Sequence, residues 1–238
     1  MTLYKLTDQQ MMTRGNTLWG EGVTHIAKFD GDGPLCSEAW IHAYEHPLIA
    51  VLRNPKDAKI NNPLLWIAEG EIGKKENQLK CGCKSLTTIK QIPLPKISLE
   101  QKVRFAIGCA WPPYINNKWR AWAENWLDNK DRTYKSAADA AHAATYTATY
   151  AAAAADAAAY AAAAADAAAY AVAATYAAAY AADAAHAADA AVAAADAAAY
   201  AADAAAAAYA ADAAHVDFIA IAEWAITDNS ISHLYPEK

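Results

Sequence analysis

The feature that most constrains the fold of this chain is a tract from residue 137 to residue 215, in which 54 of the 79 residues are alanine. The tract contains no Gly, Pro, Leu, Lys or Arg, and its charge comes from eight Asp. Alanine has the highest helix propensity, and an unbroken run of this length overcomes the cost of helix nucleation. We therefore expect helix. A single helix would be ~120 Å long, so the tract is predicted to fold back into antiparallel helices.

A ten-residue repeat of aspartate and tyrosine runs through the same tract. An aspartate is followed four residues later by a tyrosine, as in Asp156 with Tyr160, Asp166 with Tyr170 and Asp196 with Tyr200. Ten residues of α-helix turn by about 1000°, which is about 80° short of three full turns. Successive Asp/Tyr pairs therefore shift by about 80° around the helix axis and do not form one straight face. Such a shift suits helical segments whose packing partners change along the tract. The period also fits an alanine-rich β-solenoid, which stays open as the alternative although the tract has no Gly, Asn or Ser for its corners.

Tyr160, Tyr170 and Tyr200 are candidate partner-binding residues. Tyrosine supplies a large contact area at a small entropic cost, so these rows suit recognition of a protein. Mimicry of nucleic acid is disfavoured, because carboxylates spaced ~15 Å apart are sparse beside a DNA strand with one phosphate per ~3.4 Å. The alternative is that the rows only keep an alanine bundle soluble and in register.

Residues 1–97 are predicted to form a separate small head of mixed α/β structure. Residues 64–68 and 85–89 have the apolar and β-branched composition of short strands. A helix is predicted to begin after Ser37, whose hydroxyl can accept from first-turn amides, and to be kinked or ended by Pro47.

Residues 98–238 are predicted to form an alanine-rich helical domain. Two capped helices are expected within residues 98–134, the first opened by a capping box of Ser98 and Gln101. The apolar residues 216–226 are expected to form a closing helix. A tryptophan stripe at helical spacing is predicted to be core: Trp119, Trp122 and Trp126. The expected fold class is therefore α+β, a small mixed α/β head followed by an alanine-rich, all-helical body.

Charge and hydropathy favour a protein of the cytoplasm. The net charge is −6. No run approaches 18 consecutive apolar residues, and the first residues lack the apolar stretch of a signal peptide, so no membrane partner is expected. Four cysteines in a chain of this length suit free thiols in a reducing compartment.

Five side chains of the head are candidate metal ligands: Cys36, His42, His46, Cys81 and Cys83. On the predicted helix, the two histidines are four residues apart and share one face. The Cys-Gly-Cys spacing is tighter than the usual Cys-x2-Cys knuckle, so a polar cluster near a turn is the preferred interpretation. Neither a metal nor a cofactor is expected.

Several segments of the chain carry a resemblance to known proteins. They are residues 35–48, 53–55, 83–95, 104–110 and 122–127, followed by the alanine tract. In these segments the chain resembles a group of uncharacterised tailed-phage proteins. From Val103 onward its layout is also similar to alanine-rich immunity domains found beside bacterial polymorphic toxins. The resemblances imply a phage or other mobile element as the source and the cytoplasm of a bacterial host as the location.

Five side chains of the head form the candidate site of an alternative function: Lys5, His42, Tyr44, His46 and Glu71. Their order on a strand, a helix and a strand ending in carboxylates resembles ADP-ribosyltransferase-like folds, in which a strand-borne acid serves the nicotinamide ribose. The first-strand Arg or His of those enzymes is absent, and Lys5 stands in its place. An active transferase is therefore disfavoured, and a degenerate nucleotide-binding or enzymatic head is the alternative. The sequence has no phosphate loop, GxSxG elbow, HExxH motif or dinucleotide fingerprint.

The sequence thus favours a non-enzymatic protein-interaction protein of the immunity or host-modulation type. Its expected partner is a protein, binding of nucleic acid is disfavoured, and homo-oligomer formation stays open.

Overall fold

The computed structural model describes residues 1–29, 33–76, 78–111, 117–133, 136, 139–140, 216–227, 230–231 and 234–235. The chain divides into two compact units, Met1–Lys96 and Ile97–Lys238, which are described separately. Nearly all of the alanine tract lies outside the described residues. The predictions of folded-back helices, of a solenoid and of a binding role for Tyr160, Tyr170 and Tyr200 therefore lie outside them too.

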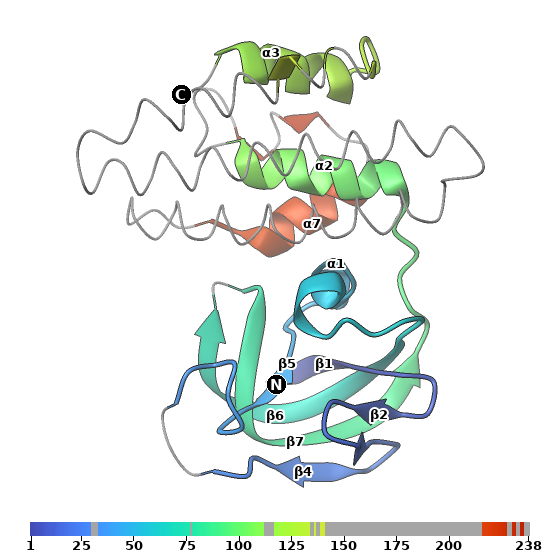
Figure 1. The fold of residues 1–238 in the computed structure, drawn as a ribbon, viewed down its shortest axis with the longest axis vertical. Helices are drawn as coiled ribbons and strands as arrows, with labels where there is room; N and C mark the ends of the chain where they lie inside the picture. Colours follow the sequence, from blue (N-terminus) through green and yellow to red (C-terminus); the bar gives the residue numbers. More distant parts are fainter. Residues whose placement is uncertain are drawn as a thin grey trace. The chain divides into compact units, whose positions relative to one another are not determined.

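A long antiparallel hairpin forms the centre of the first unit (Figure 1). Its strands are β6 (Leu64–Glu76) and β7 (Lys80–Ile92), each of 13 residues. β1 (Thr2–Thr7) pairs with β6, and β4 (Thr24–Ile26) and β5 (Ile41–Ala43) pair with successive parts of β7. A separate small hairpin consists of β2 (Met12–Thr13) and β3 (Thr17–Leu18).

The sheet curls until its ends meet. Tyr44 follows β5 directly and pairs with Tyr4 of β1, with N to O distances of 2.8 and 2.9 Å in the two directions. The order β1, β6, β7, β5 therefore returns to β1 as a ring of strands. Three register shifts in the hairpin, at Ile67/Ala68, Gly70/Ile72 and Ile72/Lys74, supply the local bends that this curvature needs.

Both hairpin strands are longer than the sequence indicates. The predicted short strands at residues 64–68 and 85–89 lie inside β6 and β7. Beyond Ala68, β6 alternates between exposed and half-buried side chains and has few large apolar residues. Backbone pairing with β7 extends this strand beyond Ala68. Such pairing does not require apolar side chains, so the sequence has no apolar run that would indicate the extension. Gly73 permits one close contact, since a Cβ there would lie 2.4 Å from the Trp40 ring.

α1 (Pro47–Asp57) begins where the sequence predicts a helix to end. The predicted helix from Ser37 to Pro47 is wrong: turns are followed by β5, in which Ile41 pairs with Cys83. Pro47 instead opens α1, with His46 as the extended N-cap residue. A proline at the first helical position loses nothing, because the N–H that it lacks would have no partner there.

The interior of the first unit is apolar and close-packed. A cluster of buried side chains lines the inside of the ring: Leu3, Trp19, Ala43, Ala68, Cys81, Cys83 and Leu86. α1 packs against β1 and contributes its own buried side chains, Leu48, Ile49, Ala50 and Leu52.

The second unit includes three helices whose bounds lie within the described residues: α2 (Leu99–Ala110), α3 (Asn117–Leu127) and α7 (Phe218–Thr227). The capping box of Ser98 and Gln101 is present in both directions. α2 and α7 pack closely, because a Cβ on Gly108 would lie 2.8 Å from the Ile221 side chain. The stripe of Trp119, Trp122 and Trp126 is buried.

The expected fold class is wrong. The first unit is rich in β-sheet, with α1 as its described helix, and is not an even mixture of helices and strands. The all-helical body is not seen: in the described part of the second unit, α2, α3 and α7 have 10 to 12 residues, and residues 128–133 after α3 are not helical. α3 ends at Leu127; two residues later Asn129 has a left-handed φ of 57°, and Lys130 N donates to Asn125 O at 2.8 Å. This cap stops the helix although no Gly or Pro follows directly.

Candidate functional site

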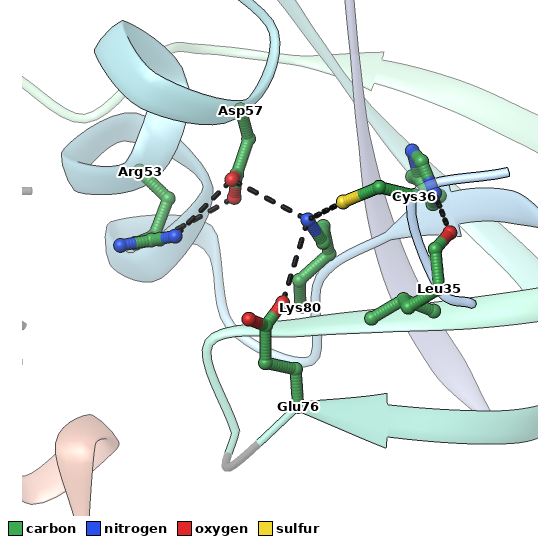
Figure 2. A network of polar contacts seen from close by, with 7 residues as sticks. Leu35, Cys36, Arg53, Asp57, Glu76 and Lys80 are labelled. Carbon is green, nitrogen blue, oxygen red and sulfur yellow. Dashed lines mark hydrogen bonds and ion pairs between the residues drawn. The ribbon is translucent and has the colours of Figure 1, made fainter. Parts of the chain in front are cut away.

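A network of buried charges lies beside the end of α1 (Figure 2). Arg53 and Asp57 are one helical turn apart, and the guanidinium donates to both carboxylate oxygens at 3.1 and 3.3 Å. Lys80, the first residue of β7, places Nζ 3.5 Å from Asp57 Oδ1 and 3.4 Å from Glu76 Oε2. Arg53 and Lys80 are only 1% and 5% exposed, so these charges are compensated mainly by one another.

The Lys80 ammonium also donates to a thiol. Its Nζ lies 3.2 Å from Sγ of Cys36, which is exposed in the turn before β5. Burial lowers the pKa of Lys80, but Asp57, the hydrogen bond with Cys36 and Glu76 together raise that pKa above its ordinary value. Lys80 therefore remains an ammonium group, held in a fixed position at the sulfur atom.

The side chains of Tyr44 and His42 lie next to this network, and both are uncharged. The Tyr44 hydroxyl bonds to Asp57, and burial, followed by the charge of Asp57, raises its pKa well above the ordinary value. His42 bonds through Nε2 to the Leu35 carbonyl, which requires the proton on Nε2. Burial lowers the pKa of His42, and the positive charges of Lys5 and Lys80 lower it further.

Lys5 lies inside the ring of strands. Its Nζ donates to the His42 carbonyl at 2.7 Å and lies 5.0 Å from the centre of the Trp19 ring. Burial lowers the pKa of Lys5 to about 8, and the nearby Cys83 and Cys81 oppose that shift. The free thiols of Cys81 and Cys83 form a hydrogen bond with each other, which lowers the pKa of Cys83 and raises the pKa of Cys81.

The five residues of the alternative head site do not share one site. Lys5 points into the core, Tyr44 bonds to Asp57, and His42 bonds to Leu35. His46 is the N-cap residue of α1 and makes no side-chain capping bond there, and Glu71 is exposed on β6. The apolar groove at the open end of the hairpin is lined by none of them; its residues are Pro63, Leu64, Leu65, Gln91, Ile92, Pro93 and Leu94.

The candidate metal ligands are also dispersed. Cys36 is exposed, whereas Cys81 and Cys83 are buried in the ring. His42 is on a strand and His46 is a cap, so the predicted shared helical face does not exist. Within the described residues, no three His, Cys, Asp or Glu side chains come together as a metal ion would need.

Four residues of this network are not among the candidates that the sequence indicates: Arg53, Asp57, Glu76 and Lys80. Arg53 and Asp57 have the i, i+4 spacing of a helical ion pair, a signal that is visible once α1 is known to start at Pro47. Lys80 and Glu76 share that spacing but lie on two strands, so their contact depends on the hairpin turn.

A second candidate is the outer edge of β4. Val23 O accepts a hydrogen bond from β7 at 3.0 Å, and Ala27 N donates to β7 at 2.8 Å. Because backbone groups alternate along a strand, the N–H and C=O groups of Thr24 and Ile26 face away from β7. We call these outward groups the β4 edge.

Exposed apolar side chains accompany the β4 edge. Ile26, Phe29 and Leu18 are 77%, 61% and 57% exposed. His25 Nε2 bonds to Leu18 O at 2.7 Å, which holds β3 beside β4. The edge therefore combines unpaired backbone groups with apolar side chains, the combination that a natural protein usually avoids on a free edge.

None of the helices in the described part of the chain has the length and apolar character that a membrane crossing needs. No family model, no curated protein and no solved structure matches the chain.

Proposed function

We propose that this chain is a non-enzymatic protein-interaction protein of the immunity or host-modulation type, encoded by a phage or another mobile element and acting in the bacterial cytoplasm. Its first unit binds the partner through the β4 edge. The observation that carries the proposal is the exposure of Ile26, Phe29 and Leu18 beside that edge.

The backbone of the β4 edge defines the kind of partner. A free edge binds an extended segment by main-chain hydrogen bonds, with alternate side chains giving specificity. β4 is three residues long, so the outward groups of Thr24 and Ile26 supply few such bonds. The apolar side chains must then contribute much of the affinity, and we infer an extended, apolar segment of a protein as the ligand.

The engagement of the polar side chains supports a binding role over a catalytic one. The polar groups of three of these side chains already have partners within the fold. Lys5 donates to the His42 carbonyl, His42 bonds to the Leu35 carbonyl, and Tyr44 bonds to Asp57. A nucleotide site built from these residues would have to break those bonds. The exposed surface at β4 needs no such rearrangement.

The proposal is tested with the full chain as bait in a lysate of a bacterial host. Ile26→Lys places a charge among the apolar side chains. Thr24→Pro removes an outward N–H without removing a backbone bond to β7, although it also removes the hydrogen bond between the Thr24 and Thr87 hydroxyls. Ile226→Lys is the matched control, since Ile226 is an exposed isoleucine of α7 in the other unit. We expect one host protein to be retained by the wild type and the control and lost from both edge variants.

Melting curves must accompany the capture experiment. Ile26→Lys is a surface change and should alter the free energy of unfolding by less than about 0.5 kcal/mol. Capture of the same protein by both edge variants at the wild-type level would refute binding at the β4 edge. A concentration-dependent dimer in sedimentation, lost in Ile26→Lys, would also contradict a host partner and identify a second copy of the chain.

A further inference from the structure

Two of the four cysteines are neighbours in the interior of the first unit. Cys81 and Cys83 are separated by one residue on β7, so both side chains point to the same face of the strand. That face is the inside of the ring, where both thiols are buried and free. The two thiols also form a hydrogen bond with each other. They therefore meet the first requirement for a disulfide, because distant cysteines cannot be bridged without a large movement of the backbone.

The backbone spacing of the pair is within the range of a disulfide. A strand rises by about 3.2–3.4 Å per residue, so the Cα atoms of residues two apart are about 6.4–6.8 Å from each other. Disulfides occur at Cα distances up to about 6.8 Å, which places this pair near the upper limit. Gly82 stands between Cys81 and Cys83 and has no Cβ to hinder a bend of the backbone. A disulfide here needs a local adjustment of β7 and leaves the order of the strands unchanged.

A buried cation distinguishes the two thiols. Lys5 projects from β1 into the same interior, where its Nζ lies 5.0 Å from the centre of the Trp19 ring. The hydrogen bond with Cys81 lowers the pKa of Cys83, burial opposes this shift, and Lys5 and the N-terminal amino group lower the pKa further. The same hydrogen bond and burial raise the pKa of Cys81. Cys83 is therefore the thiol that ionises first, with Cys81 as its protonated neighbour.

The wall of the ring beside these thiols is its shortest strand. β5 has three residues, of which Ala43 and Ile41 pair with Cys81 and Cys83. Beyond β5 the ring closes onto β1 through an isolated bridge. A short strand with few hydrogen bonds opens locally at a lower free energy than the centre of a sheet. Hydrogen peroxide is close to water in size, so it needs a smaller opening than an oxidant of the size of glutathione disulfide.

We infer that Cys81 and Cys83 are a redox-active pair, which hydrogen peroxide converts into an intramolecular disulfide. The inference does not rest on binding at β4. In the first step the Cys83 thiolate attacks one oxygen of the peroxide, an S–O bond forms, and the O–O bond breaks. Hydroxide leaves with the bonding electron pair and becomes water by taking up the proton that Cys83 released. The product is a sulfenic acid at Cys83.

The second step closes the disulfide. The sulfur of Cys81 attacks the sulfur of the sulfenic acid, an S–S bond forms, and the S–O bond breaks. Hydroxide leaves with the bonding electron pair and combines with the Cys81 proton as a second water. The two thiols lose two electrons and the peroxide gains them, so no other oxidant is needed. Dithiothreitol reverses the reaction by thiol–disulfide exchange.

Oxidation has a consequence for the ring of strands. The new bond draws the two cysteines together, so β7 bends at Gly82, which pairs with His42 of β5. The space beside this glycine is filled, since a Cβ there would lie 2.6 Å from Leu35 and 2.9 Å from Trp40. The bend therefore presses on β5 and on the turn before it. We expect the amide hydrogens of β5 to exchange faster in the oxidised chain.

The test treats the folded full chain with hydrogen peroxide at pH 7, removes the peroxide with catalase, and alkylates the remaining thiols in denaturant. Trypsin cleaves after Lys80 and Lys84, so residues 81–84 form one peptide that contains both cysteines of the pair and neither of the others. We expect this peptide to escape alkylation and to be lighter than its reduced form by two hydrogen atoms. After treatment with dithiothreitol it should be alkylated twice. Cys36→Ser, which removes the exposed thiol, should give the same result.

Two substitutions separate the roles of the two thiols. Cys81→Ala leaves the sulfenic acid at Cys83 without a second thiol, so dimedone should trap it as an adduct. Cys83→Ala should give no adduct, because Cys81 stays a protonated thiol. If neither variant folds, the peptide from the wild type decides.

Three results would overturn the inference. The first is retention of both thiols in the wild-type peptide at a peroxide dose that oxidises the exposed Cys36. The second is a disulfide that forms only at urea concentrations that unfold the chain. The third is a dimedone adduct at Cys81 of folded Cys83→Ala together with none at Cys83 of folded Cys81→Ala.

Discussion

Replacing Lys5 by methionine should stabilise the chain at neutral pH. Lys5 is 8% exposed, and its ammonium lies in the apolar interior of the ring, where Nζ donates to the His42 carbonyl at 2.7 Å. Burial lowers its pKa from 10.5 to about 8, which corresponds to about 3 kcal/mol of destabilisation at about 1.4 kcal/mol per pKa unit. Methionine has a similar length and no charge, but it leaves the His42 carbonyl without this donor, which costs about 1 kcal/mol. We expect Lys5→Met to be about 2 kcal/mol more stable than the wild type at pH 7.

The lowered pKa also fixes how this difference changes with pH. Below about pH 8 Lys5 is charged in both the folded and the unfolded chain, so the full cost of burial is present. Between about pH 8 and 10.5 the unfolded chain binds more protons than the folded chain, so the free energy of unfolding of the wild type rises with pH. The advantage of Lys5→Met should therefore shrink by about 2–3 kcal/mol between pH 7 and pH 10 and vanish near pH 10.

The assay is urea denaturation of both proteins at intervals from pH 6 to pH 10. The stability of the two proteins is compared at each pH, because groups that do not interact with Lys5, such as Tyr44, contribute equally to both. Lys90→Met serves as the control, since Lys90 is an exposed lysine of β7. A stability difference between Lys5→Met and the wild type that stays constant over this range would refute the reasoning, whatever its sign.

Two further substitutions test the packing and the charges of the first unit. Asp57→Asn should lower the free energy of unfolding by about 3–5 kcal/mol, because it leaves Arg53 and Lys80 as buried cations without a carboxylate between them. Glu76→Gln, at a half-exposed partner of Lys80, is the control in the same denaturant melts, and equal losses for both variants would contradict the assignment. Gly73→Ala should cost about 1–3 kcal/mol, because its Cβ would lie 2.4 Å from the Trp40 ring. Gly20→Ala, whose Cβ would meet Val23 at an ordinary 3.5 Å, should cost less, and equal melting temperatures of these two variants would show that the ring moves aside freely.

The features of the fold that sequence reasoning identifies are those that depend on neighbours in the chain. The capping box at Ser98 needs only Gln101 three residues later, and the tryptophan stripe needs only helical spacing. Pro47 shows the limit of such local rules. A proline can end a helix or begin one, and the choice was decided by Ile41 pairing with Cys83, 42 residues away.

The candidate site was harder to predict from the sequence than the helices, because its residues are also brought together by contacts between distant segments. Lys80, Asp57 and Cys36 lie in three separate segments, and they meet only after the hairpin, α1 and the turn before β5 are in place. Cys36 appears in the sequence as a metal ligand candidate because thiols and imidazoles share that chemistry. The structure instead provides it with an ammonium partner, which a search for metal-ligand spacing does not detect.

The ring of strands has a consequence for the order in which the chain can acquire structure. β1 is synthesised before β6 and β7, yet Thr2 pairs with Glu69, and β6 in turn pairs with β7. The β6–β7 hairpin joins residues that are close in sequence and can form early, whereas β1 must close a long loop at a larger entropic cost. On the ribosome, the N-terminal strand leaves the exit tunnel long before its partner, with Leu3 and Leu6 still exposed. The sheet is then completed when β1, made before its partner, docks onto a hairpin made after it.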